Sequence, residues 1–162
     1  MKSQELQSAL TNNTATRNVV TGVYAANTVP PVFSKLPAAC IINTDPSSRP
    51  GEHWIALYQE VPDVIEFFDS FGKDPSYHKL DLEILSNKRI IKQDRKIQSD
   101  ITTVCGQYCL FFIACRCGGK SFSQIVNVFS NSNINNDIVV LSFTNRHFSL
   151  NGKLIDCGFI LE

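Results

Sequence analysis

Apolar and polar positions along the chain predict a row of short strands in its first half. Residues 4–10 have the spacing of a short amphipathic helix, and residues 19–24 indicate an extended segment. Residues 38–43 are almost continuously apolar, as in a strand that is buried on both faces. Two more strand-like runs, at 53–58 and 64–69, flank a proline-containing turn and predict an antiparallel hairpin.

The second half is predicted to be mainly helical. Residues 77–85 are interpreted as a helix that precedes a basic stretch. Residues 104–115 are almost wholly apolar but too short to span a membrane, so they predict a buried central helix that ends at two glycines. A helix is expected at 123–129 and a loop at 131–136, whereas 138–143 fits either a helix or a strand. These elements predict one α+β domain over residues 1–162, with the hairpin of a mixed sheet packed against the central helix.

Counting along the hairpin places a histidine opposite an aspartate. With the turn centred near Val61, paired positions sum to about 122, which sets His53 against Asp69. Such a carboxylate would hold one tautomer of the imidazole and stabilise its protonated form. A surface pair without function has the same pattern, and a slip of one or two residues would pair His53 with Ser70 or Phe68 instead.

Composition indicates an intracellular globular protein. The chain is 43% apolar and has zero formal net charge, so no overall field attracts nucleic acid or anionic lipid. Its first residues lack the apolar region of a secretion signal, which predicts reduced thiols and a protein that is not secreted. The six cysteines form no C-x-x-C pair, so no metal site is expected. We also expect a monomer without membrane contact.

Cys105 is the cysteine with the best position for a nucleophile. It lies where a polar loop meets the apolar helix, and free N–H groups at a helix start favour a thiolate. Gly106 leaves room for a substrate backbone, and Gln98 would supply a neutral donor if the loop folds back. Alternatively, Cys105 is only a small residue that begins a core helix. The other cysteines, Cys40, Cys109, Cys115 and Cys117, are interpreted as structural, and Cys157 has no assigned role.

Three segments resemble the adenovirus-type protease (adenain) family: G-E-H-W-I-A-L-Y, F-F-D-S-F-G and Q-S-D-I-T-T-V-C-G-Q-Y-C-L-F-F. That family has a His-Trp strand, an acidic residue on the next strand, and a Gln seven residues before a Cys-Gly helix start. The likeness covers roughly residues 1–120. It implies the adenain-like, papain-like fold and a cysteine endopeptidase with Cys105 as nucleophile, His53 as base, Asp69 as third member and Gln98 as oxyanion donor. Trp54 would line the site beside the histidine.

Two departures from the adenovirus enzymes affect substrate and control. Those enzymes use Glu where this chain has Asp69, and Asp is usual in the related proteases of ubiquitin-like proteins. They also bind an activating peptide through a cysteine upstream of the Gln, but no cysteine lies between Cys40 and Cys105 here. A disulfide-linked activator is therefore not expected, no cofactor is required, and a peptide or DNA activator stays open.

The resemblance implies virion precursor proteins as substrates, cut at glycine-containing sites in host cytoplasm, nucleus or virion. It also leaves a protease of ubiquitin-like modifiers as an alternative. A non-enzymatic alternative is a DNA-binding or capsid scaffold protein, because one dense basic cluster could contact phosphates. Its residues are Lys88, Arg89, Lys92, Arg95 and Lys96. A solvated face explains the same cluster. His78 and His147 have no companion motif and are expected to be structural or at the surface.

Overall fold

The computed structural model describes residues 1–148 and is an α+β fold, as predicted. In chain order the elements are α1 (Ser3–Asn12), β1 (Val20–Ala25), β2 (Ala38–Asn43), β3 (Trp54–Val61), β4 (Val64–Phe68), the 3₁₀ turn η1 (Glu83–Leu85), β5 (Arg89–Lys92), α2 (Cys105–Cys117), α3 (Phe122–Val126) and α4 (Asn133–His147). The single domain predicted over 1–162 includes residues 149–162, which lie outside this description. Among residues 1–148, no helix has the length and apolar character needed to cross a bilayer.

The five strands form one mixed sheet in the order β1-β2-β3-β4-β5. The outer pairs, β1 with β2 and β4 with β5, are parallel, whereas the inner pairs are antiparallel. Strand β2 has five buried residues in succession, as its apolar run predicts. Because β3 is central and both its neighbours are antiparallel to it, the start of β3 and the end of β4 lie at the same edge of the sheet.

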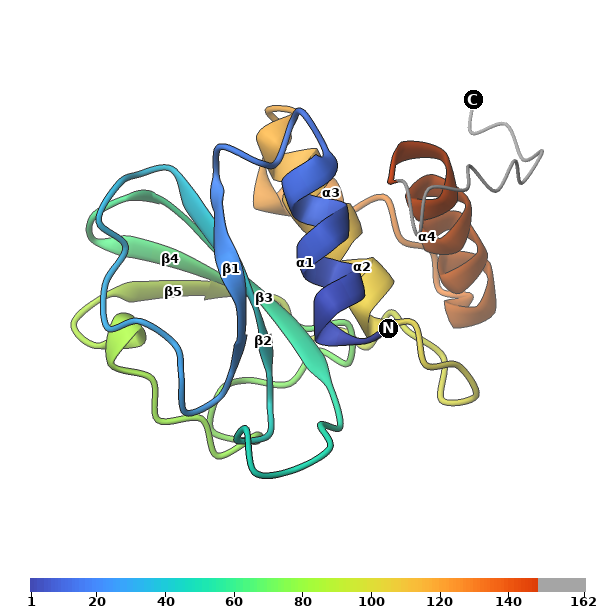
Figure 1. Cartoon of the computed structure of the whole chain (residues 1–162). Helices are drawn as coiled ribbons and strands as arrows, with labels where there is room; N and C mark the ends of the chain where they lie inside the picture. Colours follow the sequence, from blue (N-terminus) through green and yellow to red (C-terminus); the bar gives the residue numbers. More distant parts are fainter. Residues whose placement is uncertain (149–162) are drawn as a thin grey trace.

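Helices cover one face of the sheet, and loops cover the other (Figure 1). On the helical face, α1 and α2 pack against the sheet, while α3 and α4 pack against α2. The core there includes Phe68 of β4, whose ring stacks on that of Phe112 in α2 with centroids 4.5 Å apart. A second core, between the sheet and the loops, contains Phe33, Leu82 and Ile84. The central helix is thus packed directly against β4.

Two predicted elements were wrong, and one strand was not predicted. Residues 77–85 are turns that end in η1, because their apolar residues alternate and Leu82 and Ile84 fill the second core. The basic stretch contains strand β5, which becomes a strand by pairing with β4. Residues 133–136 are the first turn of α4 rather than a loop, because the Ser132 side chain caps the helix by accepting from Asn135 N. The stretch 138–143, unassigned from sequence, is helical.

Candidate active site

Three predicted residues meet where β3, β4 and α2 converge. His53 directly precedes β3, Asp69 directly follows β4, and Cys105 is the first residue of α2. The His53 carbonyl accepts from Thr44 N at 2.9 Å, so its backbone is held by the strand ladder. The Phe68 ring, stacked on α2, fixes the position from which Asp69 projects. Residues about fifty positions apart in sequence therefore share one site.

The observed hairpin register differs from the predicted one by two positions. Ala56 pairs with Phe68, so paired positions sum to 124, and the turn lies later in the sequence than predicted. Continuing this register sets His53 opposite Phe71, and the two ring centroids are 4.8 Å apart. Since side chains alternate faces with period two, a slip of two keeps Asp69 on the same face as His53. Asp69 reaches the histidine as a diagonal neighbour rather than a direct partner.

A tight turn holds Asp69 in place. Gly72 N donates to the Asp69 carbonyl at 3.0 Å, and Gln93 Nε2 donates to the same oxygen at 2.6 Å. Gly72 has a φ of 67°, and a Cβ there would lie 2.7 Å from the carbonyl carbon of Arg95. Both the positive φ and the close approach require glycine. The F-F-D-S-F-G segment therefore builds a rigid mount for the carboxylate.

The Asp69 carboxylate binds His53 directly. His53 Nε2 lies 2.6 Å from Asp69 Oδ1, and that oxygen also accepts from Phe71 N at 2.9 Å. Burial by itself would raise the pKa of Asp69, but the hydrogen bonds from His53 and His78 hold that pKa well below its usual range. The carboxylate is thus ionised at neutral pH. Since Nε2 is committed to Asp69, Nδ1 is the ring nitrogen left for the thiol.

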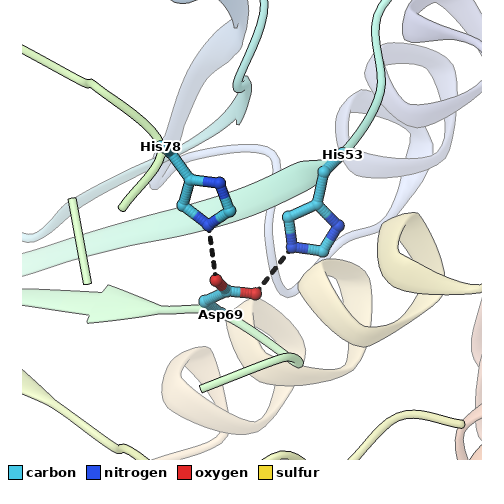
Figure 2. Close-up of side chains that lie close together, drawn as sticks. All are labelled: His53, Asp69 and His78. Atoms are coloured by element: carbon cyan, nitrogen blue, oxygen red, sulfur yellow. Dashed lines mark hydrogen bonds and ion pairs between the residues drawn. The ribbon is translucent and has the colours of Figure 1, made fainter. Parts of the chain in front are cut away.

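A second histidine, not expected from the sequence, binds the other carboxylate oxygen. His78 Nε2 lies 2.7 Å from Asp69 Oδ2, and its side chain is 10% exposed (Figure 2). The His53 and His78 rings stack with centroids 5.4 Å apart. The expectation that His78 is structural or at the surface did not include this contact with Asp69. Nothing in the spacing marks it, because the loop between β4 and η1 folds back to bring it there.

The thiol and the imidazole favour each other's charged forms. Burial tends to raise the pKa of Cys105, but hydrogen bonding to His53, the nearby imidazolium charge and the N–H groups of Trp54 and Gly106 lower it overall. Burial tends to lower the pKa of His53, yet its contacts with Asp69 and Cys105 raise it to about 9. The arrangement thus supports a thiolate–imidazolium pair, which is a nucleophile with a proton donor beside it.

Among the described cysteines, only Cys105 has a lowered pKa. Burial raises the pKa of Cys40 and Cys109 strongly, that of Cys115 to about 11, and also that of Cys117. These four thiols are therefore protonated and inert at neutral pH, in keeping with a structural role. Cys157 lies outside the described residues.

Gln98 lies in the loop that leads to Cys105. Its Oε1 accepts from Ser70 Oγ at 2.7 Å, and its Nε2 donates to Thr102 O at 3.1 Å. The side chain is 1% exposed and does not line the cleft beside Cys105. Its amide nitrogen keeps a second hydrogen that these contacts do not use. An oxyanion formed on a substrate would need to accept a hydrogen bond through that hydrogen.

Comparisons with known proteins agree with this chemistry. Two curated relatives from African swine fever virus are a cysteine protease of a Tick/Malawi isolate, 29% identical over 104 residues, and a SUMO-1 cysteine protease of a Warthog/Namibia isolate, 28% identical over 104 residues. Each match covers 54% of this chain and 37% of the relative. The chain is similar to viral cysteine proteases. The matched relatives belong to this virus and not to an adenovirus.

The chain spans well under half of the length of the curated relatives it matches. No family model matches it. A crystal structure of the African swine fever virus protease overlaps with a TM-score of 0.45 and 22% identity, over 64% of this chain and 42% of that one.

Trp54 lines a cleft of about 810 Å³ together with Cys105, and its role as a substrate contact stays a prediction. Its Nε1 donates to Met1 O at 3.1 Å, so residues at the N-terminus form part of the cleft wall. Gly106 is placed differently. A Cβ there would lie 3.3–3.4 Å from Leu6, Met1 and Trp54, so the missing side chain makes room for these residues, and Gly106 does not line the cleft.

The residues of the basic cluster differ in what they contact. Arg95 Nη2 donates to the carbonyls of Val126 and Phe129, near the end of α3, and Lys88 Nζ donates to Ile84 O. Lys96 pairs with Asp100. Arg89 and Lys92 are exposed on β5. Three of the five cations are therefore engaged with protein groups, and DNA contact stays a prediction that rests mainly on the other two.

The two histidines and Asp69 also offer three possible metal ligands, with atoms within 4.8 Å of one another. Both carboxylate oxygens are already hydrogen-bonded to ring nitrogens. A metal there would replace those hydrogens and tie up the His53 nitrogen that holds Asp69. The absence of a metal site, expected from cysteine spacing, stays a prediction.

Proposed function

We propose that this chain is a cysteine endopeptidase that uses Cys105 as nucleophile. One observation carries the proposal: the buried His53 ring joins an ionised carboxylate, 2.6 Å from Nε2, to the one described thiol with a lowered pKa. That thiol begins a helix and opens onto a cleft. The similarity to viral cysteine proteases supports the same reaction.

In the first half of the reaction, the Cys105 thiolate attacks the scissile carbonyl carbon. The carbonyl oxygen becomes an oxyanion, which the Cys105 backbone N–H and the free hydrogen of Gln98 Nε2 would stabilise. When the intermediate collapses, the C–N bond breaks and His53 Nδ1 gives its proton to the leaving amine. The product is a thioester on Cys105 and a free amine.

In the second half, neutral His53 removes a proton from water as it attacks the thioester. Collapse of the second intermediate releases the carboxylic acid and restores the thiolate beside the imidazolium. Asp69 stays ionised throughout, so it orients the ring and stabilises its positive form. The nucleophile, the base and the oxyanion donors in this cycle come from the chain, and the attacking water comes from solvent.

We propose virion precursor proteins, cut at glycine-containing sites, as substrates. Proteolysis of a ubiquitin-like modifier is the second candidate, because relatives are named SUMO-1 cysteine proteases and Asp69 suits that class. The experiment presents SUMO-1 fusions and short glycine-containing peptides to the wild type and to Cys105→Ala. Cleavage of the peptides by the wild type but not by Cys105→Ala supports precursor processing. Cleavage of the fusions only overturns that substrate, and no Cys105-dependent cleavage overturns the peptidase itself.

A further inference from the structure

Helix α4 contributes a buried carboxylate that the proposed reaction does not use. Asp137 is 2% exposed and faces the loop between β5 and α2, which contains Gln98. Burying a carboxylate is costly unless its oxygens find donors. The groups that donate to Asp137 show which segments of the chain its carboxylate connects.

The groups that donate to Asp137 all follow Gln98 in the sequence. Asp137 Oδ2 accepts from Thr102 Oγ1 at 2.7 Å, and Oδ1 accepts from Ser99 N at 3.4 Å. Oδ1 also lies 2.8 Å from the hydroxyl of Tyr108, a residue one turn after Cys105. Thr102 is the residue whose carbonyl accepts from Gln98 Nε2. One carboxylate thus connects the nucleophile's helix with the loop that carries the amide.

The neighbouring residue anchors the start of the same loop. Asn136 Nδ2 donates to Ile97 O at 3.1 Å, and Asn136 is also 2% exposed. The Tyr108 hydroxyl lies 2.9 Å from that same carbonyl, so its single hydrogen is shared between Ile97 and Asp137. The loop is therefore held before Gln98 by Asn136 and after it by Asp137.

We propose that Asn136 and Asp137 are positioning residues that set the Gln98 amide relative to Cys105. This inference rests on the proposed function, since it assigns to α4 the alignment of the oxyanion donor. Displacement of a reacting group by about 1 Å can cost on the order of 100-fold in rate. A loop freed at Thr102 would move the Gln98 amide without changing the contacts among Cys105, His53 and Asp69.

The test compares Asp137→Asn with the exposed control Asn135→Ala, a neighbour on α4. For Asp137→Asn we expect kcat to fall about 10-fold with KM nearly unchanged. The affinity for an acetylated tripeptide aldehyde ending in glycinal should fall by a similar factor. The rate of Cys105 alkylation by iodoacetamide, which forms no oxyanion, should stay the same. In a Gln98→Ala background the Asp137 change should cost little, because coupled residues are not additive.

An equal loss in the Gln98→Ala background, or alkylation slowed as much as kcat, would overturn the proposal. Should Asp137→Asn fail to fold, Thr102→Val removes one of the same hydrogen bonds and should give the same pattern on a smaller scale. Amide hydrogen exchange of residues 97–104 tests the positioning even if no substrate is cleaved. It should accelerate in Asp137→Asn while exchange in α2 is unchanged, and an unchanged loop counts against the proposal.

Discussion

Ser70 donates its hydroxyl hydrogen to Gln98 Oε1 across 2.7 Å. The residue before it, Asp69, binds His53 with its carboxylate. Ser70 O also accepts from the backbone N–H of both Ile97 and Gln98, at 2.9 and 3.1 Å. Two consecutive residues after β4 therefore orient the His53 ring on one side and the Gln98 amide on the other. The same turn thus positions both the proposed base and the proposed oxyanion donor.

Ser70→Ala should reduce kcat, because the Gln98 amide would lose the hydrogen bond that fixes its orientation. The buried Oε1 would lose its donor, which costs on the order of 1–3 kcal/mol. Gln98→Ala should cost about 100- to 1000-fold in kcat, as loss of an oxyanion donor does elsewhere. Steady-state kinetics check both. If Ser70→Ala lowers kcat as much in the Gln98→Ala background as in the wild type, the two residues do not act together.

Cys105 should be the thiol that iodoacetamide labels first at mildly acidic pH. Its pKa is lowered, whereas burial raises those of Cys40, Cys109, Cys115 and Cys117. Peptide mapping after brief labelling measures the site. His53→Ala removes the imidazolium and should slow the labelling of Cys105 at that pH. Equal labelling of all the cysteines would contradict the thiolate–imidazolium pair of Cys105 and His53.

Peptidase activity should fall as pH rises through about 9, because the raised pKa of His53 has that value. Above it the imidazolium is lost, and with it the proton for the leaving amine. In Asp69→Asn the ring loses a charged partner worth about 1.5–3 kcal/mol, so the alkaline limit should move down by about one to two pH units. A pH profile of kcat for both proteins measures the shift. An unmoved limit would mean that Asp69 does not set the pKa of His53.

His78→Ala should lower both stability and activity, because Asp69 Oδ2 keeps only the Lys73 N–H at 3.3 Å. Leaving that buried oxygen poorly bonded costs on the order of 1–3 kcal/mol, and kcat should fall as the carboxylate gains freedom. His78→Gln, which retains a donor, should recover part of the loss. His147→Ala is the matched control. If His147→Ala and His78→Ala had equal effects on kcat, His78 would have no specific role in the site.

Arg95→Gln should destabilise the fold, whereas Arg89→Gln should not. Arg95 Nη2 donates to the carbonyls of Val126 and Phe129, while Arg89 is exposed on an edge strand. Thermal unfolding measures the difference. The same pair tests the DNA prediction, since loss of an exposed phosphate contact lowers the salt dependence of binding by about one ion. DNA binding that is unaltered in Arg89→Gln would argue against a phosphate contact at β5.

The sequence alone predicted those features of this site that depend on residues close together in the chain. Two strand-like runs around a proline-containing turn predicted the hairpin, the apolar run predicted β2, and the change from polar loop to apolar helix marked Cys105. The hairpin also put His53 and Asp69 on one face, and this survived a register error of two because side chains repeat with that period. These features depend on neighbouring residues, which is why a pattern along the chain reveals them.

Only the tertiary structure decided which distant groups complete the site. His78 reaches Asp69 through a loop with no periodicity, and Ser70 meets Gln98 because the chain returns beside its own turn. Asp137 acts from a helix whose first turn looked like a loop, since its asparagines are poor helix formers until Ser132 caps them. Hydrogen bonds between side chains on separate loops leave no spacing rule in a sequence. They follow from packing, and packing is specified by the whole fold.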